Sequence, residues 1–260
     1  MLINSYRFGD ADANAYIAAV ETADGQALEG DTRAAITAFV VGCKADGIWN
    51  AIKASCILAG ARTLSGALVP LIGTAPTNNN FVSGDYDRKT GLVGNRTTKY
   101  LNSNRNNNAD PQNSRHLGAY VSTGDSASSG AQYIIGGGNT GYNGIGRVAT
   151  SNLLVGYLAT GSNSIQVNGQ GNTTGFKGVS RSTNSSISIR TSGSTTSATQ
   201  NSAAETTALS VAIFASNEPA QITSYTSARL SFYSIGESLD LALLDARVTT
   251  LMSAFAAAIP

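Results

Sequence analysis

The sequence is poor in cysteine, histidine and charge. Its 260 residues include two cysteines and one histidine. Cys43 and Cys56 are too few for a disulfide-stapled scaffold, and together with His116 they do not make up an ordinary zinc site. Charged residues account for 13% of the chain, and the formal net charge is +1. These counts predict no electrostatic attraction to nucleic acid or to an anionic membrane surface.

Long hydrophobic runs are also missing. No apolar run approaches the ~18 residues that a helix needs to cross a bilayer. The first ten residues lack the basic and apolar regions of a secretory signal. Hydrophobic residues nevertheless make up 42% of the chain, which is enough to build a folded core. We therefore expect a folded protein with no membrane-spanning segment.

Helical periodicity occurs near both ends of the chain. Apolar residues follow the i, i+3, i+4, i+7 spacing that places them on one helix face. In the first helix they are Ala13, Tyr16, Ile17 and Val20, and in the second they are Ile36, Phe39, Val40 and Cys43. The region from Ser238 to Pro260 has a similar pattern. We expect residues 1–53 to form a helical attachment segment, because two short amphipathic helices cannot bury their apolar faces alone.

The middle of the chain, from residue 54 to about 233, has the pattern of a β protein. Short apolar or alternating runs recur between Gly, Ser, Thr and Asn residues, which is typical of many short strands. The expected strands are Cys56–Leu58, Leu68–Ile72, His116–Ser122, Gln132–Ile135, Asn152–Leu158, Ser164–Val167, Ser186–Arg190, Ala208–Ala215 and Ala228–Ser234. The Gly-rich segments at 136–138 and 144–146 are interpreted as turns, and the Asn-rich 102–113 and Ser/Thr-rich 191–199 segments as solvated loops. The pattern predicts a mostly β fold in which two antiparallel sheets form a sandwich.

Two stretches resemble a known group of proteins. The run from Phe81 to Leu92, continued by Thr98 to Arg105, and the closing run from Leu230 to Leu239 are similar to laminin-G/concanavalin-A-like jelly rolls of tailed-bacteriophage structural proteins. In that family the last strand continues directly into a short helix. The resemblance implies that residues 54–260 form an antiparallel jelly-roll sandwich that ends in a C-terminal helix. It also implies a virion location after synthesis in the host cytoplasm, other virion proteins as partners and, by analogy with fibres, a homotrimer.

The sequence argues against catalysis. Glycoside hydrolysis uses two carboxylates on either side of the scissile bond, and residues 126–204 contain no Asp or Glu. A single histidine leaves His116 as the one imidazole base for a nucleophilic triad. We interpret it as a hydrogen-bonded histidine at a sheet edge. The chain is therefore expected to be non-enzymatic.

Three sets of residues are candidates for binding. Asp85, Asp87 and Asp110 carry oxygen donors suited to calcium, although aspartates are also frequent turn formers; the favoured expectation is no cofactor. Tyr133, Tyr142 and Arg147 flank a Gly-rich segment and are candidates for a shallow glycan site. The alternative is that these tyrosines pack between the sheets. The assembly candidates are Ile36, Phe39, Val40 and Trp49.

The expected function is a non-enzymatic virion structural protein, either a tail fibre or a tail-tip component that attaches by its N-terminal helices and displays the sandwich. Deletion of residues 1–53 is expected to leave a folded β domain that no longer assembles. One alternative is a capsid cement or decoration protein, and another is a lectin that binds host-surface glycans.

Overall fold

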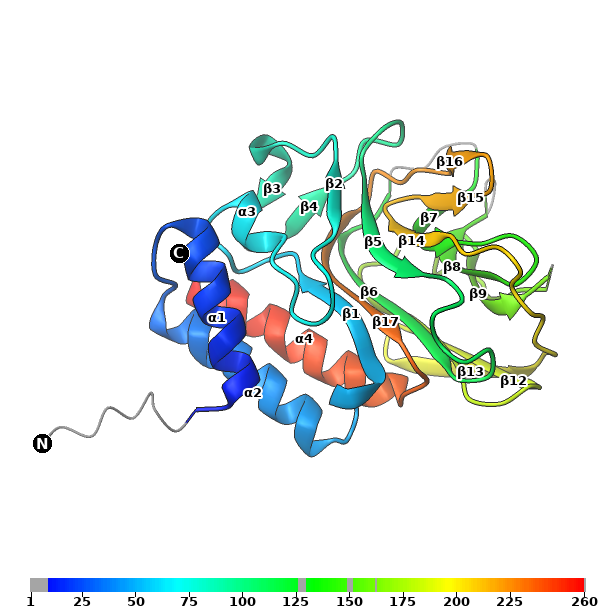
Figure 1. The fold of residues 1–260 in the computed structure, drawn as a ribbon, viewed down its shortest axis with the longest axis horizontal. Coiled ribbons are helices and arrows are strands. Elements are labelled where there is room, and N and C mark those ends of the chain that lie inside the picture. The colour runs from blue at the N-terminus through cyan, green and yellow to red at the C-terminus, as the bar shows by residue number, and fades with distance from the viewer. Residues whose placement is uncertain (1–8, 126–129, 149–151, 162, 260) are drawn as a thin grey trace, which may run out of the picture.

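The computed structural model describes residues 9–125, 130–148, 152–161 and 163–259 (Figure 1). Four α-helices and seventeen strands are assigned in these ranges. The helices are α1 (Ala11–Asp24), α2 (Gly30–Ala45), α3 (Leu64–Ala67) and α4 (Leu241–Ala258), with 3₁₀ turns at Trp49–Ala51 and Ser83–Asp85. The strands are β1 (Ile52–Ile57), β2 (Thr77–Asn79), β3 (Tyr86–Asp87), β4 (Gly91–Val93), β5 (Tyr100–Asn106), β6 (Arg115–Thr123), β7 (Gln132–Gly137), β8 (Tyr142–Arg147), β9 (Leu154–Thr160), β10 (Ile165–Val167), β11 (Gly175–Arg181), β12 (Ser186–Thr191), β13 (Ser194–Thr199), β14 (Ser210–Ile213), β15 (Ser216–Glu218), β16 (Gln221–Thr223) and β17 (Arg229–Gly236).

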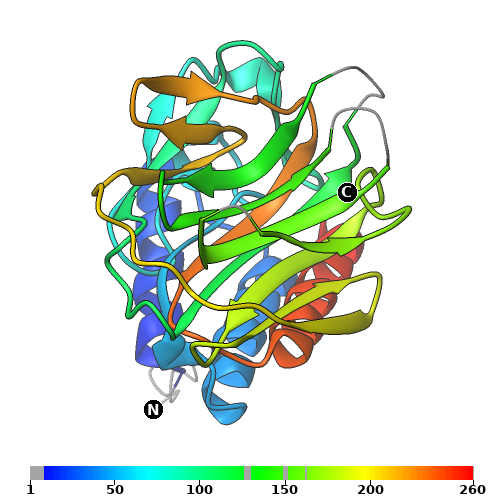
Figure 2. The same ribbon diagram turned by 90° about the vertical axis from the view of Figure 1, so that its right-hand side faces the viewer.

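The strands form two stacked sheets. The helix-side sheet has the order β13-β12-β11-β6-β17-β4-β3, with β1 paired to β17. The far sheet has the order β10-β9-β8-β7-β14-β5-β2, with β15 paired to β7 and β16 paired to β15. The strand pairs are antiparallel except for the contact between β15 and β7. The predicted jelly-roll sandwich is confirmed. Figure 2 views the far sheet with the helices behind it.

Two hydrophobic cores share the helix-side sheet. Successive side chains of a strand point to opposite faces of its sheet, and β17 supplies both cores in this way. Phe232 belongs to the core beneath the helices, and its neighbour Tyr233 belongs to the core between the sheets. The described part of the chain therefore has three layers, which are the helices, the helix-side sheet and the far sheet.

Helices α1 and α4 each begin at an aspartate that caps the first turn. Asp10 caps α1 by accepting hydrogen bonds from the backbone amides of Asp12 and Ala13, and Gly25 ends the helix in the left-handed region at φ 66°. Asp240 caps α4 in the same way. The predicted apolar faces of α1 and α2 are buried, and β17 leads into α4 as the resemblance implied.

The four assembly candidates lie inside the molecule or at its edge rather than on an open surface. Ile36, Phe39 and Val40 are buried, and the ring of Phe39 meets that of Phe232 edge-to-face with centroids 5.8 Å apart. Trp49 is half-buried, with the ammonium of Lys44 5.5 Å from its ring centroid. The expectation that Ile36, Phe39 and Val40 form an assembly surface is corrected: their apolar face is covered by the chain's own sheet and by α4.

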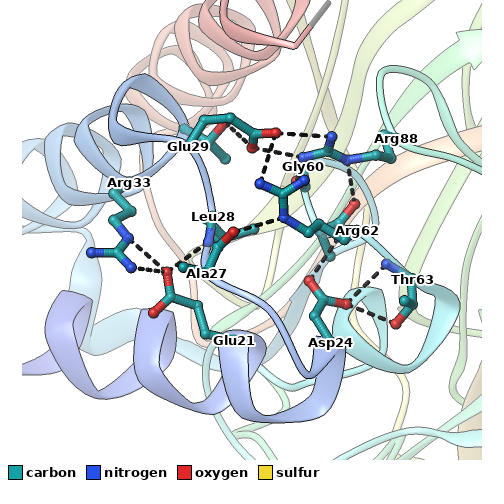
Figure 3. Close-up of polar contacts among 12 residues, drawn as sticks. Glu21, Asp24, Ala27, Leu28, Glu29, Arg33, Gly60, Arg62, Thr63 and Arg88 are labelled. Atoms are coloured by element: carbon teal, nitrogen blue, oxygen red, sulfur yellow. Dashed lines mark hydrogen bonds and ion pairs between the residues drawn. The ribbon is translucent and has the colours of Figure 1, made fainter.

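Ion pairs fasten the turn between α1 and α2 to the sandwich (Figure 3). Glu29 accepts two hydrogen bonds from the guanidinium of Arg88, at 3.1 and 2.8 Å, and pairs with Arg62 at 3.1 Å. Asp24 accepts hydrogen bonds from the backbone amides of Arg62 and Thr63, at 2.7 and 2.9 Å. These contacts join residues far apart in the chain and fix the helices on the helix-side sheet.

The pairing of Glu29 with Arg88 makes the stability of this junction depend on acidity. The Arg88 guanidinium lowers the pKa of Glu29 to about 2, whereas the same carboxyl in the unfolded chain has its ordinary, higher pKa. The stabilisation is complete above the unfolded value and is lost as the pH falls towards 2. We expect Glu29→Gln to lower the free energy of unfolding at pH 7 by about 1–2 kcal/mol. Urea denaturation at pH 7 and pH 3 checks this, and an equal loss at both pH values contradicts it.

Four sequence expectations differ from the structure. Leu68–Ile72 is not a strand and makes a single bridge, from Ile72 to Ser55. The Asn-rich segment contains β5, the Ser/Thr-rich segment contains β13, and the two Gly-rich segments lie in or directly beside β7 and β8. β13 is wholly exposed and pairs with β12 through its backbone, so it needs no apolar residues. Strands that bury little apolar area carry little sequence signal.

Helix α4 is, among the described residues, the one helix whose length and composition would suffice for a membrane span. Leu244, Val248 and Phe255 are buried on its inner face. They pack in the core beneath the helices, where α2 and β11 contact α4. The position of α4 against this core therefore explains why the helix is so apolar.

Candidate functional site

Three tyrosines meet on the outer face of the far sheet. They come from three adjacent strands: Tyr133 from β7, Tyr142 from β8 and Tyr157 from β9. The ring centroid of Tyr142 lies 5.5 Å from that of Tyr133 and 5.4 Å from that of Tyr157, and both pairs are edge-to-face. Edge-to-face contacts are a favoured geometry for aromatic pairs. We refer to these three residues as the tyrosine cluster.

Glycines form the floor of the tyrosine cluster. Tyr133 lies opposite Gly146 in the β7–β8 pair, and Tyr157 lies opposite Gly144 in the β8–β9 pair. A Cβ atom on Gly144 would stand 2.8 Å from the Tyr142 ring, and one on Gly146 would stand 2.7 Å from the Tyr133 ring. The missing side chains let the rings lie down against the sheet. The Gly-rich segments thus serve the tyrosines as a platform and not as turns.

The tyrosine cluster lines an open hollow of about 310 Å³. Its other lining residues are Gly138, Asn139, Gly161, Glu218 and Pro219. This volume is at the small end of ligand sites, which span roughly 300–1,000 Å³. The hollow combines aromatic rings with polar groups, which is the usual character of a ligand site.

The rim of the hollow is held by two glutamates. Glu205 Oε2 accepts hydrogen bonds from the backbone amides of Asn139 and Gly141, at 2.6 and 3.2 Å. Glu218 stands at the end of β15, where Thr223 donates to its Oε1 at 2.8 Å. Glu205 thereby fixes the loop between β7 and β8, and Glu218 presents a carboxylate to the hollow.

The hydroxyls of Tyr133 and Tyr142 are held in their protonated form. Burial, aided by neighbouring tyrosines and by the charge of Glu218, raises the pKa of Tyr142 well above its ordinary value. Burial also raises the pKa of Tyr133. The hydroxyl of Tyr142 forms a 2.6 Å hydrogen bond with that of Ser216. The cluster therefore offers apolar ring faces together with the neutral hydroxyl groups of Tyr133 and Tyr142.

Arg147 lies away from the tyrosine cluster. It is five residues beyond Tyr142 on β8, and an odd separation along a strand places two side chains on opposite faces. Arg147 is buried on the inner face, where its guanidinium bonds to the side chain of Gln132. The structure thus brings together Tyr133 and Tyr142 of the three glycan candidates and separates Arg147 from them.

The three calcium candidates are each engaged elsewhere. Asp85 forms an ion pair with Lys99, and Asp110 forms one with Arg105. Asp87 accepts hydrogen bonds from the backbone amides of Lys89 and Thr90, as a turn-forming aspartate does. Within the described ranges, no three His, Cys, Asp or Glu side chains converge as a metal site. The three aspartates therefore do not form one cation site.

His116 is buried and fully hydrogen-bonded. Its Nδ1 lies 2.6 Å from the backbone oxygen of Glu237, and its Nε2 lies 2.6 Å from the hydroxyl of Ser234. A carbonyl oxygen can only accept, so Nδ1 donates and Nε2 accepts from Ser234. Both side chains are sealed from solvent, which leaves no room for a substrate at this Ser–His pair.

Three further residues of the site, Tyr157, Glu205 and Glu218, are not among the residues that the sequence predicts. Tyr157 lies in the predicted strand Asn152–Leu158, and an alignment of β8 with β9 would have placed it opposite a glycine. The two glutamates follow the acid-free stretch 126–204, and nothing local marks them as site residues. The position of Glu218 depends on β15 pairing with β7, eighty residues earlier in the chain, and that of Glu205 depends on its hydrogen bonds to the loop between β7 and β8.

Comparisons with known proteins show the fold. No family model and no curated protein matches the chain. The binding domain of botulinum neurotoxin serotype D matches 77% of the chain with 12% identity and a TM-score of 0.52, and the match spans about half (52%) of the toxin domain. The CBM40 of the Ruminococcus gnavus IT-sialidase, bound to α2,3-sialyllactose, matches 53% of the chain and 82% of its own length, with 10% identity and a TM-score of 0.42. The NanB sialidase of Streptococcus pneumoniae matches 54% of the chain and 24% of its own length, with 12% identity and a TM-score of 0.41. The likeness to the toxin domain, at 12% identity, shows that the chain shares a β-sandwich fold with a protein of very different sequence.

Proposed function

We propose that this chain is a glycan-binding β-sandwich module and that the tyrosine cluster is its binding surface. The observation that carries the proposal is the arrangement of three tyrosine rings over a glycine floor, opening to a hollow with Asn139 and Glu218 at its rim. Sugar rings have an apolar face that covers an aromatic ring and hydroxyl groups that bond to polar side chains. The proposed activity is binding without catalysis, because Glu218 is the one carboxylate among the lining residues and glycoside hydrolysis uses two.

A glycan array followed by titration calorimetry tests this function. We expect Tyr157→Ala and Tyr142→Ala each to weaken binding about tenfold or more, since an aromatic contact contributes roughly 1 kcal/mol beyond the area it buries. Tyr225→Ala is the matched control: Tyr225 forms an edge-to-face pair with Tyr100, at 6.2 Å, and does not line the hollow. Array binding that is absent, or that survives both cluster substitutions, overturns the proposal.

For the setting of this module, we propose display on the virion of a tailed phage. The resemblance of residues 81–92, 98–105 and 230–239 supports it, as does the continuation of β17 into α4. A tail fibre or tail tip places a glycan-binding surface where a host is met, whereas a capsid decoration protein does not. Antibody labelling of purified virions distinguishes these locations by electron microscopy. Virions that carry no label overturn this setting without affecting glycan binding.

A further inference from the structure

The hollow beside the tyrosine cluster faces negative charge. Glu218 is the one charged side chain among its lining residues, and none of them is Lys, Arg or His. Glu218 also acts on the cluster: its charge contributes to the raised pKa of both Tyr133 and Tyr142. A ligand in the hollow would therefore meet the field of a carboxylate.

A second carboxylate lies just behind the rim. Glu205 accepts backbone hydrogen bonds from the loop that carries Asn139, and a Cβ atom on Gly138 would come within 2.7 Å of its Oε2. Arg115 interacts with the charge of Glu205, but it is buried in the interior and donates to backbone oxygens of residues 107–111. No cation that could pair with an incoming anion is therefore presented at the hollow by the described residues that line it.

The available hydrogen-bonding groups suit sugar hydroxyls. Glu218 Oε1 is occupied by Thr223, and its Oε2 accepts no hydrogen bond from the described residues. Oε2 is thus free to accept from a sugar hydroxyl, whereas the carboxylate group of an acidic sugar has no proton to donate to it. A bound carboxylate would instead sit beside a like charge without a partner, which is costly in a partly desolvated site.

From this charge arrangement we propose that the tyrosine hollow selects uncharged sugars and discriminates against sialic and uronic acids, with Glu218 as the discriminating residue. This inference rests on the proposed glycan-binding function and narrows its ligand class. It differs from what the fold likeness alone would suggest, since one similar structure holds sialyllactose.

Matched pairs of probes test the selectivity on the full chain. Lactose and N-acetyllactosamine are compared with their 3′-sialylated forms, and cello-oligosaccharides with the corresponding uronic acids, by calorimetry at low and high salt. The expected result is at least tenfold weaker binding of the acidic member of each bound pair. The difference is expected to shrink at high salt, because salt screens exposed charges.

The Glu218→Gln variant assigns the discrimination to one side chain. It preserves an oxygen that can accept from Thr223 while removing the charge, so we expect the gap between neutral and acidic probes to narrow at least threefold. Glu237→Gln is the control, because Glu237 pairs with Lys53 at 3.0 Å and does not line the hollow. Tighter binding of acidic probes, or an unchanged gap in Glu218→Gln, overturns the selectivity and leaves glycan binding standing. If no probe binds and the array is empty, both the function and its selectivity fail.

Discussion

A chain that begins at Ile52 will not fold into a stable sandwich. Removal of residues 1–51 takes away α1 and α2 and exposes Phe232, whose ring meets that of Phe39 on α2, together with the face of α4 that contacts α2. Each large apolar side chain that returns to water costs about 1.5–3 kcal/mol. A typical domain has a free energy of unfolding of only about 5–15 kcal/mol. The loss of two helices that cover the sheet is expected to cost more than this total. Circular dichroism and urea denaturation are expected to show no cooperative transition.

Single substitutions in the full chain measure how much the packing of α2 contributes to stability without removing any part of the chain. We expect Phe39→Ala to lower the free energy of unfolding by about 3–5 kcal/mol. Val41→Ala is the matched control on the same helix, because Val41 is 46% exposed and surface changes usually stay within about 0.5 kcal/mol. A truncated chain that unfolds cooperatively with the midpoint of the full protein contradicts this account. It would favour the expectation that the β domain folds after deletion of residues 1–53.

Periodicity predicted the elements that bury one face. The apolar faces of α1 and α2 and the alternating strand at Ser186–Arg190 follow from spacing alone, and the structure confirms them. Spacing could not predict what those faces would meet. The apolar face of α2 packs against Phe232, which is almost two hundred residues later in the chain. The expectation of a separate attachment segment depended on that missing long-range information.

The glycine-rich strands show a different limit of sequence analysis. Glycine is depleted in strands because it loses more entropy on ordering than other residues and offers nothing to pack. Segments such as 144–146 therefore have the appearance of turns. In the structure, the rings of Tyr142 and Tyr133 fill the space above Gly144, and the ring of Tyr133 fills the space above Gly146. β8 is therefore covered by its own Tyr142 and by Tyr133 of the neighbouring strand β7.

The candidate site was predicted in part. Tyr133 and Tyr142 stand near the same Gly-rich segment, and the structure places their rings together. Arg147 is close to these tyrosines in sequence and so belongs to the same predicted site. Because β8 is a strand, the alternation of its side chains places Arg147 on the opposite face of the sheet from Tyr142. Glu218, the residue on which ligand selectivity depends, reaches the hollow only through sheet pairing between β15 and β7.

The stability of the protein is expected to fall by about 2 kcal/mol between pH 7 and pH 5 because of His116 alone. Burial lowers the pKa of His116 to about 4 in the folded protein, whereas an unfolded histidine has a pKa of about 6.5. Between these values the unfolded chain binds a proton that the folded chain does not, so stability rises with pH across this window. Protonation of the folded state would place a second N–H against Ser234, inside the core.

His116 is the one histidine of the chain, so the slope of stability between pH 5 and pH 6.5 can be assigned to it. Urea denaturation of the wild type and of His116→Gln, each at pH 7 and pH 5, provides the measurement. The substitution lowers stability at both pH values, because it disturbs the contacts to Ser234 and Glu237, but its change with pH is expected to be under about 0.5 kcal/mol. The difference between the two pH values is taken for each protein separately, so that the loss of packing in the variant cancels.

The carboxyl group of Glu29 provides a separate check, because its pKa of about 2 means that its contribution to stability is lost at lower pH. A wild-type curve that is flat from pH 7 to pH 5, or a variant that keeps the full slope, contradicts a neutral buried imidazole.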